Sequence, residues 1–358
     1  MSGYDYGNAR IRAMKSRLLS RPEIEALAQL GNVQTLINAL TKSAYHRAVE
    51  EALVRRRGLA CIAEALNRDL VDTLGKVRRF YSGRAGELVA IMLWAYDVHN
   101  LKTILRGLSK HVTPDEITAA LLPVGELTPP VLARLARTPE PRAAIDLLAS
   151  MRLPIAQPLL ELRAKQPGAD IFEMELALDR WRFRQAYTSI EQSPRATEHL
   201  RSALDTDADL ANLRTALRFA HSPAEREVFR ARMKSDQLER LFLGPGRLSF
   251  ELLTRVSKQD SLGDAIKALT GTPYKAPLQA GLEEYTRSGR LSDLEKRLLH
   301  LRLRWLAGLI IKDPLGIGVP LGYCALKTNE VSNIRWIAHG INLGLGGDAV
   351  RAELEFAT

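Results

Sequence analysis

Residues 97–102 read Asp97-Val98-His99-Asn100-Leu101-Lys102, and this stretch decides how we expect the chain to fold. In an α-helix, positions three, four, seven and eight residues apart share one face. Counted from Asp97, that face continues through Asn100 and Leu101 to Ile104 and Leu105. The stretch therefore predicts a helix whose apolar face opens on an acid and an amide.

The same pattern occurs twice more: an acid, two further residues, Asn, then Leu or Ile, then a base. Buried polar groups need hydrogen-bond partners. The acid and the amide either bind a neighbouring backbone segment or helix end, which we favour, or they line a surface that the repeats share. The nine residues of this repeat signature, which are also our candidates for an interface, are Asp97, Asn100, Lys102, Asp209, Asn212, Arg214, Glu330, Asn333 and Arg335.

A second pattern has the same threefold recurrence. Leu followed by Ser or Thr stands 17 residues before an apolar pair that ends in Ile. The chain then consists of three units of about 110–120 residues. Units of this length are too long to be solenoid repeats, which run to about 20–50 residues. We therefore predict three homologous helical domains, residues 1–124, 125–245 and 246–358. The Leu-Ser/Thr pairs are Leu19-Ser20, Leu127-Thr128 and Leu248-Ser249.

The rest of the chain also favours helices. Ala, Leu, Arg and Glu are abundant, and these are strong helix formers. Ser20, Thr113 and Ser222 are each followed within two residues by Pro, which is typical of a cap residue and the first helical turn. Alternating β-branched runs with hairpin turns are missing. We predict an all-α protein.

The charge admits two kinds of protein. In 358 residues, 51 Lys and Arg stand against 41 Asp and Glu, which gives a net charge of +10 and favours an anionic neighbour. Residues 55–57, 76–79 and 180–184 are basic clusters, and the last mixes Arg with Trp and Phe as single-strand binders do. A basic helical protein that binds nucleic acid is therefore the alternative function, although for the Arg and aromatic cluster we favour a solvated helix face with Trp181 or Phe183 turned inward.

Patterns that would indicate catalysis are missing from the sequence. It has no phosphate-binding loop, no zinc-ligand spacing and no nucleophile elbow. Only two cysteines occur, Cys61 and Cys324, which favours a reducing compartment over a disulfide framework. The apolar stretches fall short of the ~20 residues that a membrane-spanning helix needs. We expect no enzymatic activity, cofactor, bound metal or small-molecule substrate.

Five segments spread along the chain resemble, in their order and spacing, the C subunit of the V-type (archaeal and bacterial A-type) rotary ATPase, a relative of the eukaryotic d subunit. The similarity runs nearly end to end. After residues 313–316 it continues through Tyr323 and Lys327 into the third copy of the signature. The segments that carry it are residues 4–16, 97–106, 208–218, 269–274 and 313–316.

The resemblance implies three pseudo-symmetric helical-bundle domains arranged as a funnel. It also implies a non-catalytic rotor subunit, peripheral to the membrane on its cytoplasmic face, that couples the central stalk to the membrane ring and transmits torque for proton or sodium transport. The implied partners are the D-type and F-type stalk subunits and the ring of proteolipid subunits, with no nucleic acid. Within this chain, the opening segment and the third repeat are candidates for the interface.

Overall fold

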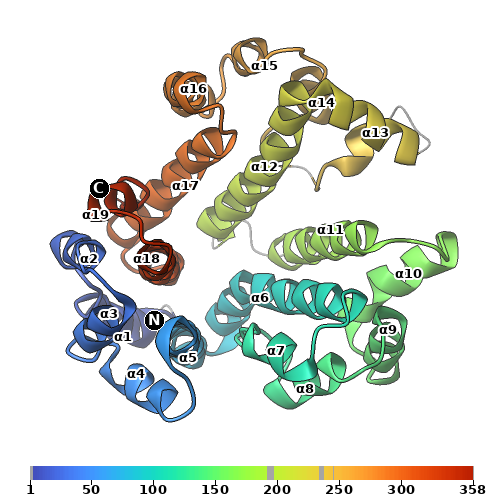
Figure 1. Cartoon of the computed structure of the whole chain (residues 1–358). Coiled ribbons are helices and arrows are strands. Elements are labelled where there is room, and N and C mark those ends of the chain that lie inside the picture. Colours follow the sequence, from blue (N-terminus) through green and yellow to red (C-terminus); the bar gives the residue numbers. More distant parts are fainter. Residues whose placement is uncertain (1–2, 192–196, 234–237, 245, 358) are drawn as a thin grey trace. The chain divides into compact units, whose positions relative to one another are not determined.

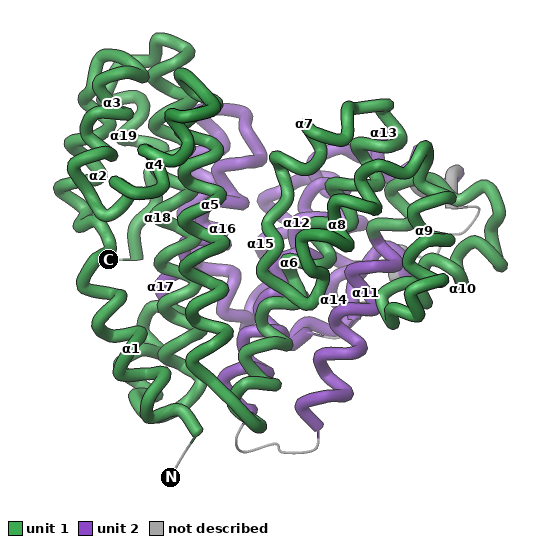
Figure 2. The backbone as a smooth tube through the Cα atoms, turned by 90° about the horizontal axis from the view of Figure 1, so that it is seen from below, with its two compact units in different colours: residues 1–175, 306–358 green, residues 176–305 purple. Residues whose placement is uncertain are grey.

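The computed structural model describes residues 3–191, 197–233, 238–244 and 246–357. These residues form α-helices and short 3-10 turns and contain no β-strand, which confirms the predicted all-α class. The chain divides into two compact units, one of residues 1–175 and 306–358 and one of residues 176–305 (Figure 2). We describe each unit by itself.

The three predicted helix starts are confirmed. Helices α2, α7 and α13 each begin one residue after the expected cap, at Arg21, Pro114 and Pro223. The first N–H groups of a helix lack partners within it. At α7, the Thr113 hydroxyl accepts a hydrogen bond from the backbone N–H of Glu116, and the Glu116 carboxylate accepts one from the backbone N–H of Thr113. This reciprocal capping box explains why the chain turns into a helix there.

The first unit contains both the beginning and the end of the described chain. Its long helices are α5, α6 and α18, and Figure 1 shows α18 beside α5 and the short helices α2 and α3. Helices α11 (Ile171–Ile190) and α17 (Ser292–Lys312) each run across the boundary between the units. The other elements of this unit are α1 (Asp5–Lys15), α2 (Arg21–Ala28), α3 (Val33–Leu40), α4 (His46–Leu53), α5 (Gly58–Arg79), α6 (Gly83–Ser109), α7 (Pro114–Ala119), α8 (Pro129–Ala136), α9 (Pro141–Ser150), η1 (Pro154–Ala156), α10 (Gln157–Lys165), α18 (Gly318–Asn342) and α19 (Gly347–Ala352).

One hydrophobic core of this unit joins helices from the beginning of the chain to α18, near its end. Leu36 and Leu40 from α3 and Leu66 from α5 belong to the same cluster as Ile334 and Ile337 from α18. Each of these side chains is buried, and burial of such a side chain contributes about 1.5–3 kcal/mol. This core therefore fixes α18 against the N-terminal helices.

The second unit is built around α12 in the same way. Leu213 and Leu217 on α12 pack in one core with Leu253 on α14, Ile266 on α15 and Leu278 on α16. These positions repeat the face predicted from the signature, one and five residues after Asn212. The elements of this unit are α12 (Glu198–His221), α13 (Pro223–Met233), η3 (Leu238–Leu241), α14 (Phe250–Ser257), α15 (Leu262–Ala268) and α16 (Lys275–Ser288).

Candidate functional site

The acid and amide of each signature, here called the acid–amide pair, lie buried on a long helix. On α6, the Asp97 carboxylate accepts hydrogen bonds from the backbone N–H groups of Glu126 (2.8 Å) and Leu127 (2.9 Å). Asn100 donates to the carbonyl of Leu122 (2.8 Å) and accepts from its N–H (2.7 Å). This pair therefore holds the segment that leads into α8.

The pair on α12, in the second unit, resembles that on α6, although the buried amide nitrogen of Asn212 has no hydrogen-bond partner in the part of the chain that the structure describes. Asp209 accepts hydrogen bonds from the backbone N–H groups of Arg247 (3.2 Å) and Leu248 (3.0 Å), just before α14. The hydroxyl of Tyr274 adds a third at 2.8 Å. Asn212 accepts from the N–H of Leu243 at 2.6 Å. The segment before α14 is thus held at two points, as the segment before α8 is.

The pair on α18 binds two segments that are distant from each other in the sequence. Glu330 accepts a hydrogen bond from the backbone N–H of Leu19 (2.5 Å), just before α2. Asn333 donates to the carbonyl of Glu355 (2.7 Å) and accepts from its N–H (3.1 Å). The third pair therefore fastens the N-terminal helices to the C-terminal segment.

The acids and the Leu-Ser/Thr pairs, which form two separate sequence patterns, meet in the structure. The carboxylates of Asp97, Asp209 and Glu330 bind the N–H of Leu127, Leu248 and Leu19, respectively. The residues that follow these leucines are the caps of α8, α14 and α2. Each acid therefore sets where a short helix starts, and the interface role of the nine signature residues stays a prediction.

The third acid works in a different steric setting from the other two. Two residues before the bound leucine stand Gly125, Gly246 and Arg17, respectively. A Cβ atom at Gly125 or Gly246 would overlap the carboxylate of Asp97 or Asp209. Glu330 is one methylene longer than Asp, and the corresponding Arg17 has a side chain. Glycine therefore occurs at this position where the acid is Asp, because the shorter side chain requires the backbone to come closer.

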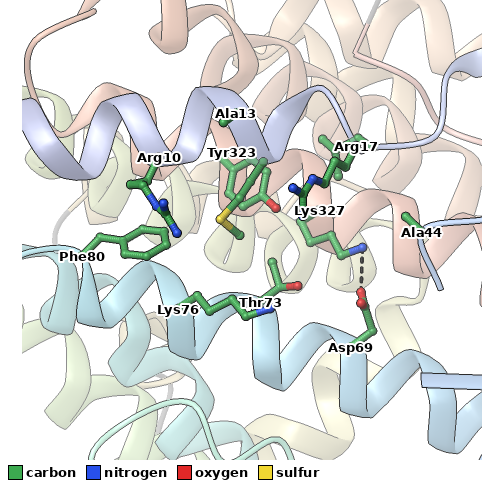
Figure 3. A pocket seen from close by; sticks show the side chains of 12 residues that line it. Arg10, Ala13, Arg17, Ala44, Asp69, Thr73, Lys76, Phe80, Tyr323 and Lys327 are labelled. Carbon is green, nitrogen blue, oxygen red and sulfur yellow. Dashed lines mark ion pairs between the residues drawn. The ribbon is translucent and has the colours of Figure 1, made fainter. Parts of the chain in front are cut away.

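The third acid also has a cation beside it. Nζ of Lys327 lies 2.7 Å from Glu330. It also lies 2.7 Å from Asp69 on α5, the ion pair drawn in Figure 3. The hydroxyl of Tyr45 donates to Glu330 (2.6 Å) and accepts from Lys327 (2.9 Å), and the ammonium group stands over the Tyr45 ring. Lys327, Glu330 and Tyr45 are buried, so two carboxylates, one ammonium and one hydroxyl form a compact network.

Tyr45 and Tyr274 are equivalent residues that the sequence patterns did not single out. Each lies 26 residues after the leucine that its acid binds, Leu19 or Leu248, and this shared spacing was the available signal. The corresponding residue after Leu127 is Leu153, so the Asp97 pair has no such hydroxyl. Burial and the nearby Glu330 raise the pKa of Tyr45, which keeps its hydroxyl a hydrogen-bond donor.

Burial sets the electrostatics of the two aspartates. It raises the pKa of Asp97, while the backbone N–H groups of Glu126 and Leu127 oppose the rise because they stabilise the anion. Burial likewise raises the pKa of Asp209, against the hydrogen bonds from Leu248 and Tyr274. In both sites the hydrogen-bond donors thus offset part of the rise in pKa that burial causes.

Two bases of the signature bind partners outside these networks. Arg335 donates to the side chain of Asn67 (2.7 Å), and burial lowers its pKa. Arg214 pairs with Glu295 at 3.0 Å and is half exposed. The third base, Lys102, lies on α6, two residues after Asn100 and three residues before the buried Leu105. The acid and the amide of each repeat thus lie on one helix; those of α6 and α12 each bind a single segment, and those of α18 bind two. Arg214 and Arg335 bind elsewhere.

The opening segment binds the turn at residues 313–316. Asn8 donates to the carbonyl of Gly316 (3.0 Å), and Arg12 donates to that of Pro314 (2.6 Å). The Tyr81 hydroxyl donates to Asn8 at 2.7 Å. Two segments that carried the family resemblance thus meet. Large exposed apolar side chains belong to these segments and the end of α17: Tyr6, Ile311 and Leu315.

The Arg and aromatic cluster of α11 is folded into the second unit. Phe183 is buried, and the Arg182 guanidinium lies over its ring at 4.2 Å. Arg180 donates to the carbonyls of Arg240 and Phe242. The stacking ladder expected for a single-strand binder is therefore not formed by these described residues, and nothing in the structure supports the nucleic-acid alternative.

The cysteines, the potential metal ligands and the long helices of the described residues complete the description of the site. Both cysteines, Cys61 and Cys324, are buried and unpaired. Within residues 3–191, 197–233, 238–244 and 246–357, no three His, Cys, Asp or Glu side chains are grouped to hold a metal ion. In the same ranges, no helix combines the length and apolar character that crossing a membrane requires.

A family match covers nearly all of the segments that carried the resemblance predicted from the sequence. Residues 7–353 match the family described as ATP synthase (C/AC39) subunit. The chain belongs to this family. Among its relatives, the C subunit of the A-type ATP synthase of Haloferax volcanii is 26% identical over 353 residues, which cover 99% of this chain and 97% of the relative. The proteins of the same name from Methanosarcina acetivorans and Methanocaldococcus jannaschii are 27% and 24% identical, over 93% and 86% of their lengths.

Membership of the ATP synthase (C/AC39) family covers all three acid–amide pairs. The matched range begins one residue before Asn8 and ends two residues before Glu355, the partner of Asn333. The Leu19, Leu127 and Leu248 segments all lie inside it. The predicted resemblance is thereby confirmed across nearly the whole chain, rather than in one motif.

Proposed function

We propose that this protein is the non-catalytic subunit that couples the central stalk of an A/V-type ATP synthase to its membrane ring. The observation that carries the proposal is the family match over residues 7–353, together with curated relatives named as the C subunit of A-type ATP synthase. On this proposal the partners are the D-type and F-type stalk subunits and the proteolipid ring. The protein sits on the cytoplasmic face of the membrane and transmits torque for proton or sodium transport.

We further propose that the chain consists of three homologous helical domains arranged as a funnel, with boundaries near residues 124 and 245. The threefold recurrence of the acid–amide pair and its bound leucine supports this. A part that passes torque must resist deformation. Buried charge-assisted hydrogen bonds at the start of a short helix in each repeat contribute to such stiffness.

A coupling test uses the whole complex. We expect an ATP synthase assembled without this subunit to hydrolyse ATP without pumping ions, and addition of the purified chain to restore ATP-driven pumping. Ion movement into vesicles and phosphate release are measured on the same samples. Pumping that is equally fast with and without the chain would refute the coupling role.

A binding test locates the contact surface. Tyr6, Ile311 and Leu315 are 65%, 80% and 66% exposed, and exposed apolar groups near one another mark interaction surfaces. We expect Ile311→Ser with Leu315→Ser to weaken co-elution of the chain with the detergent-solubilised ring or the stalk heterodimer. The matched control is Val54→Ser with Leu343→Ser, which removes two equally exposed apolar side chains, 81% and 73%, elsewhere in the same unit. Failure of the unchanged chain to bind either partner would exclude the proposal.

A further inference from the structure

A pocket of about 310 Å³ lies within the first unit, between α1, α5 and α18. Arg10, Ala13 and Arg17 come from one face of α1 or the residues just beyond it, at spacings of three and four. Asp69, Thr73, Lys76 and Phe80 line it from α5 at similar spacings, and Tyr323 and Lys327 from α18. Figure 3 shows these side chains around one space. Ligand pockets are commonly about 300–1,000 Å³, so this one suits a small molecule.

The rim of the pocket carries uncompensated positive charge. Arg10, Arg17 and Lys76 are exposed, and none of them forms an ion pair with a carboxylate of the described chain. Arg10 lies over the ring of Phe80 at 5.5 Å, which leaves its N–H groups available. Lys327, deeper in the pocket, is already bound by Asp69 and Glu330. The three rim cations therefore line a space whose inner group, two carboxylates and one ammonium, carries a net charge of −1, so the lining as a whole is positive.

The inner wall adds neutral donors and an apolar surface. Burial raises the pKa of Tyr323 while Arg17 opposes the rise, so its hydroxyl stays protonated and can donate. Thr73, one turn before Lys76, adds a second hydroxyl to the lining. Met14, Leu18 and Phe80 supply apolar atoms beside them. A ligand here meets cations on one side and hydroxyl and apolar groups on the other.

We propose that this pocket binds a phosphate group, held by Arg10, Arg17 and Lys76, on a small organic molecule or a lipid headgroup. A tetrahedral phosphate has several terminal oxygens, which can accept from donors that approach from different directions. Arginine binds phosphate with two parallel hydrogen bonds, and lysine binds it as a point charge. All the lining residues belong to the first unit, and the binding of phosphate can be measured on the chain alone, without the stalk or the ring.

The test uses the full chain and two kinds of probe. Calorimetry measures binding of inorganic phosphate and glycerol 3-phosphate. Co-sedimentation measures binding to phosphatidylcholine vesicles with and without phosphatidylglycerol. We expect at least one kind of probe to bind, and Arg17→Ala with Lys76→Ala to weaken that binding by about tenfold or more, since each removes a charge-assisted hydrogen bond. Binding of the soluble probes indicates a soluble phosphate ester, and binding only to phosphatidylglycerol vesicles indicates a lipid headgroup.

The matched control is Arg142→Ala with Lys165→Ala, which removes the same charge from exposed residues of the same unit that do not line the pocket. It should bind as the unchanged chain does. A second variant, Arg17→Gln, keeps most of the side chain and should weaken binding in the same direction. The proposal is overturned if neither kind of probe binds, or if the pocket variant and the control lose affinity equally. Urea unfolding of every variant verifies that it is folded.

Discussion

The acid–amide pairs of α12 and α18 do the same work with different chemistry. Asp209 holds the Leu248 segment with hydrogen bonds alone, two from backbone N–H groups and one from Tyr274. Glu330 holds Leu19 with one backbone hydrogen bond and shares Lys327 with Asp69. The first arrangement depends on close backbone approach, and the second depends on charge balance.

The difference follows from one methylene group. The shorter aspartate reaches its donors only where a glycine, Gly246, lets the backbone come near. The longer Glu330 reaches Leu19 past a residue with a side chain, Arg17, and the position three residues before it is Lys327 instead of Thr206. Replacing residues at these equivalent positions should therefore damage the two units unequally.

The largest effect is expected at the cation. Lys327→Met removes the only ammonium group within ion-pair distance of Glu330 among the described residues and leaves two carboxylates close together. Loss of one partner of a buried ion pair costs about 3–5 kcal/mol, and urea unfolding should show a loss of this size. Adding Glu330→Gln and Asp69→Asn should recover part of it, because the uncompensated charges are then gone.

The control for this change is Thr206→Val at the equivalent position before Asp209. Thr206 donates a hydrogen bond to the carbonyl of Ser202 at 2.8 Å, and its side chain also bonds that of Tyr274. Both bonds are between neutral groups, so their loss should cost only about 1–2 kcal/mol. Equal losses for Lys327→Met and Thr206→Val would show that charge balance is not what distinguishes the two pairs.

The next largest effect is expected when the backbone at Gly246 can no longer lie close to the Asp209 carboxylate. In Gly246→Ala the new methyl group would overlap the Asp209 carboxylate and lie 2.8 Å from the carbonyl oxygen of Asp205. Forcing extra atoms into a packed site costs about 1–3 kcal/mol, and we expect the upper end of that range because backbone must move. Gly263→Ala is the control in the same unit, since its added Cβ meets nothing nearer than 3.9 Å. A Gly246→Ala protein as stable as the Gly263→Ala protein would contradict this account.

The tyrosines give a smaller, graded effect. The Tyr274 hydroxyl makes one bond to a carboxylate, and the Tyr45 hydroxyl links Glu330 with Lys327. A hydrogen bond to a charged group contributes about 1.5–3 kcal/mol. We expect Tyr274→Phe to lose about 2 kcal/mol in urea unfolding, and Tyr45→Phe to lose more because it breaks two such bonds. The reverse order would mean that Lys327 alone satisfies Glu330.

The sequence predicts which residues of the two pairs are buried and which leucine segments recur, but it does not predict which residues bind each other. Helical periodicity places Asp209 and Asn212 at the head of a buried face, and both leucine segments appear in a second pattern. Periodicity shows which face of a helix is buried but not which neighbour covers it. The bond between Leu19 and Glu330, 311 residues apart, therefore could not be predicted. Nor could the burial of Lys327, whose stabilising partner Asp69 lies on another helix.

The smallest effect is a pH dependence centred on Asp209. Burial raises its pKa above the usual 3.8, so the folded protein retains this proton at a pH where the unfolded chain has released it. The stability that Asp209 contributes is therefore present in full below pH 3.8 and declines as the pH rises through the higher folded value. Relative to Asp209→Asn, which cannot titrate there, the unchanged protein should lose free energy of unfolding over this interval. Tyr274→Phe should extend the decline to higher pH, because the Tyr274 hydrogen bond holds the pKa of Asp209 down. Urea unfolding at a series of pH values measures all three proteins, and a difference that grows in the opposite direction would show that the backbone donors outweigh burial.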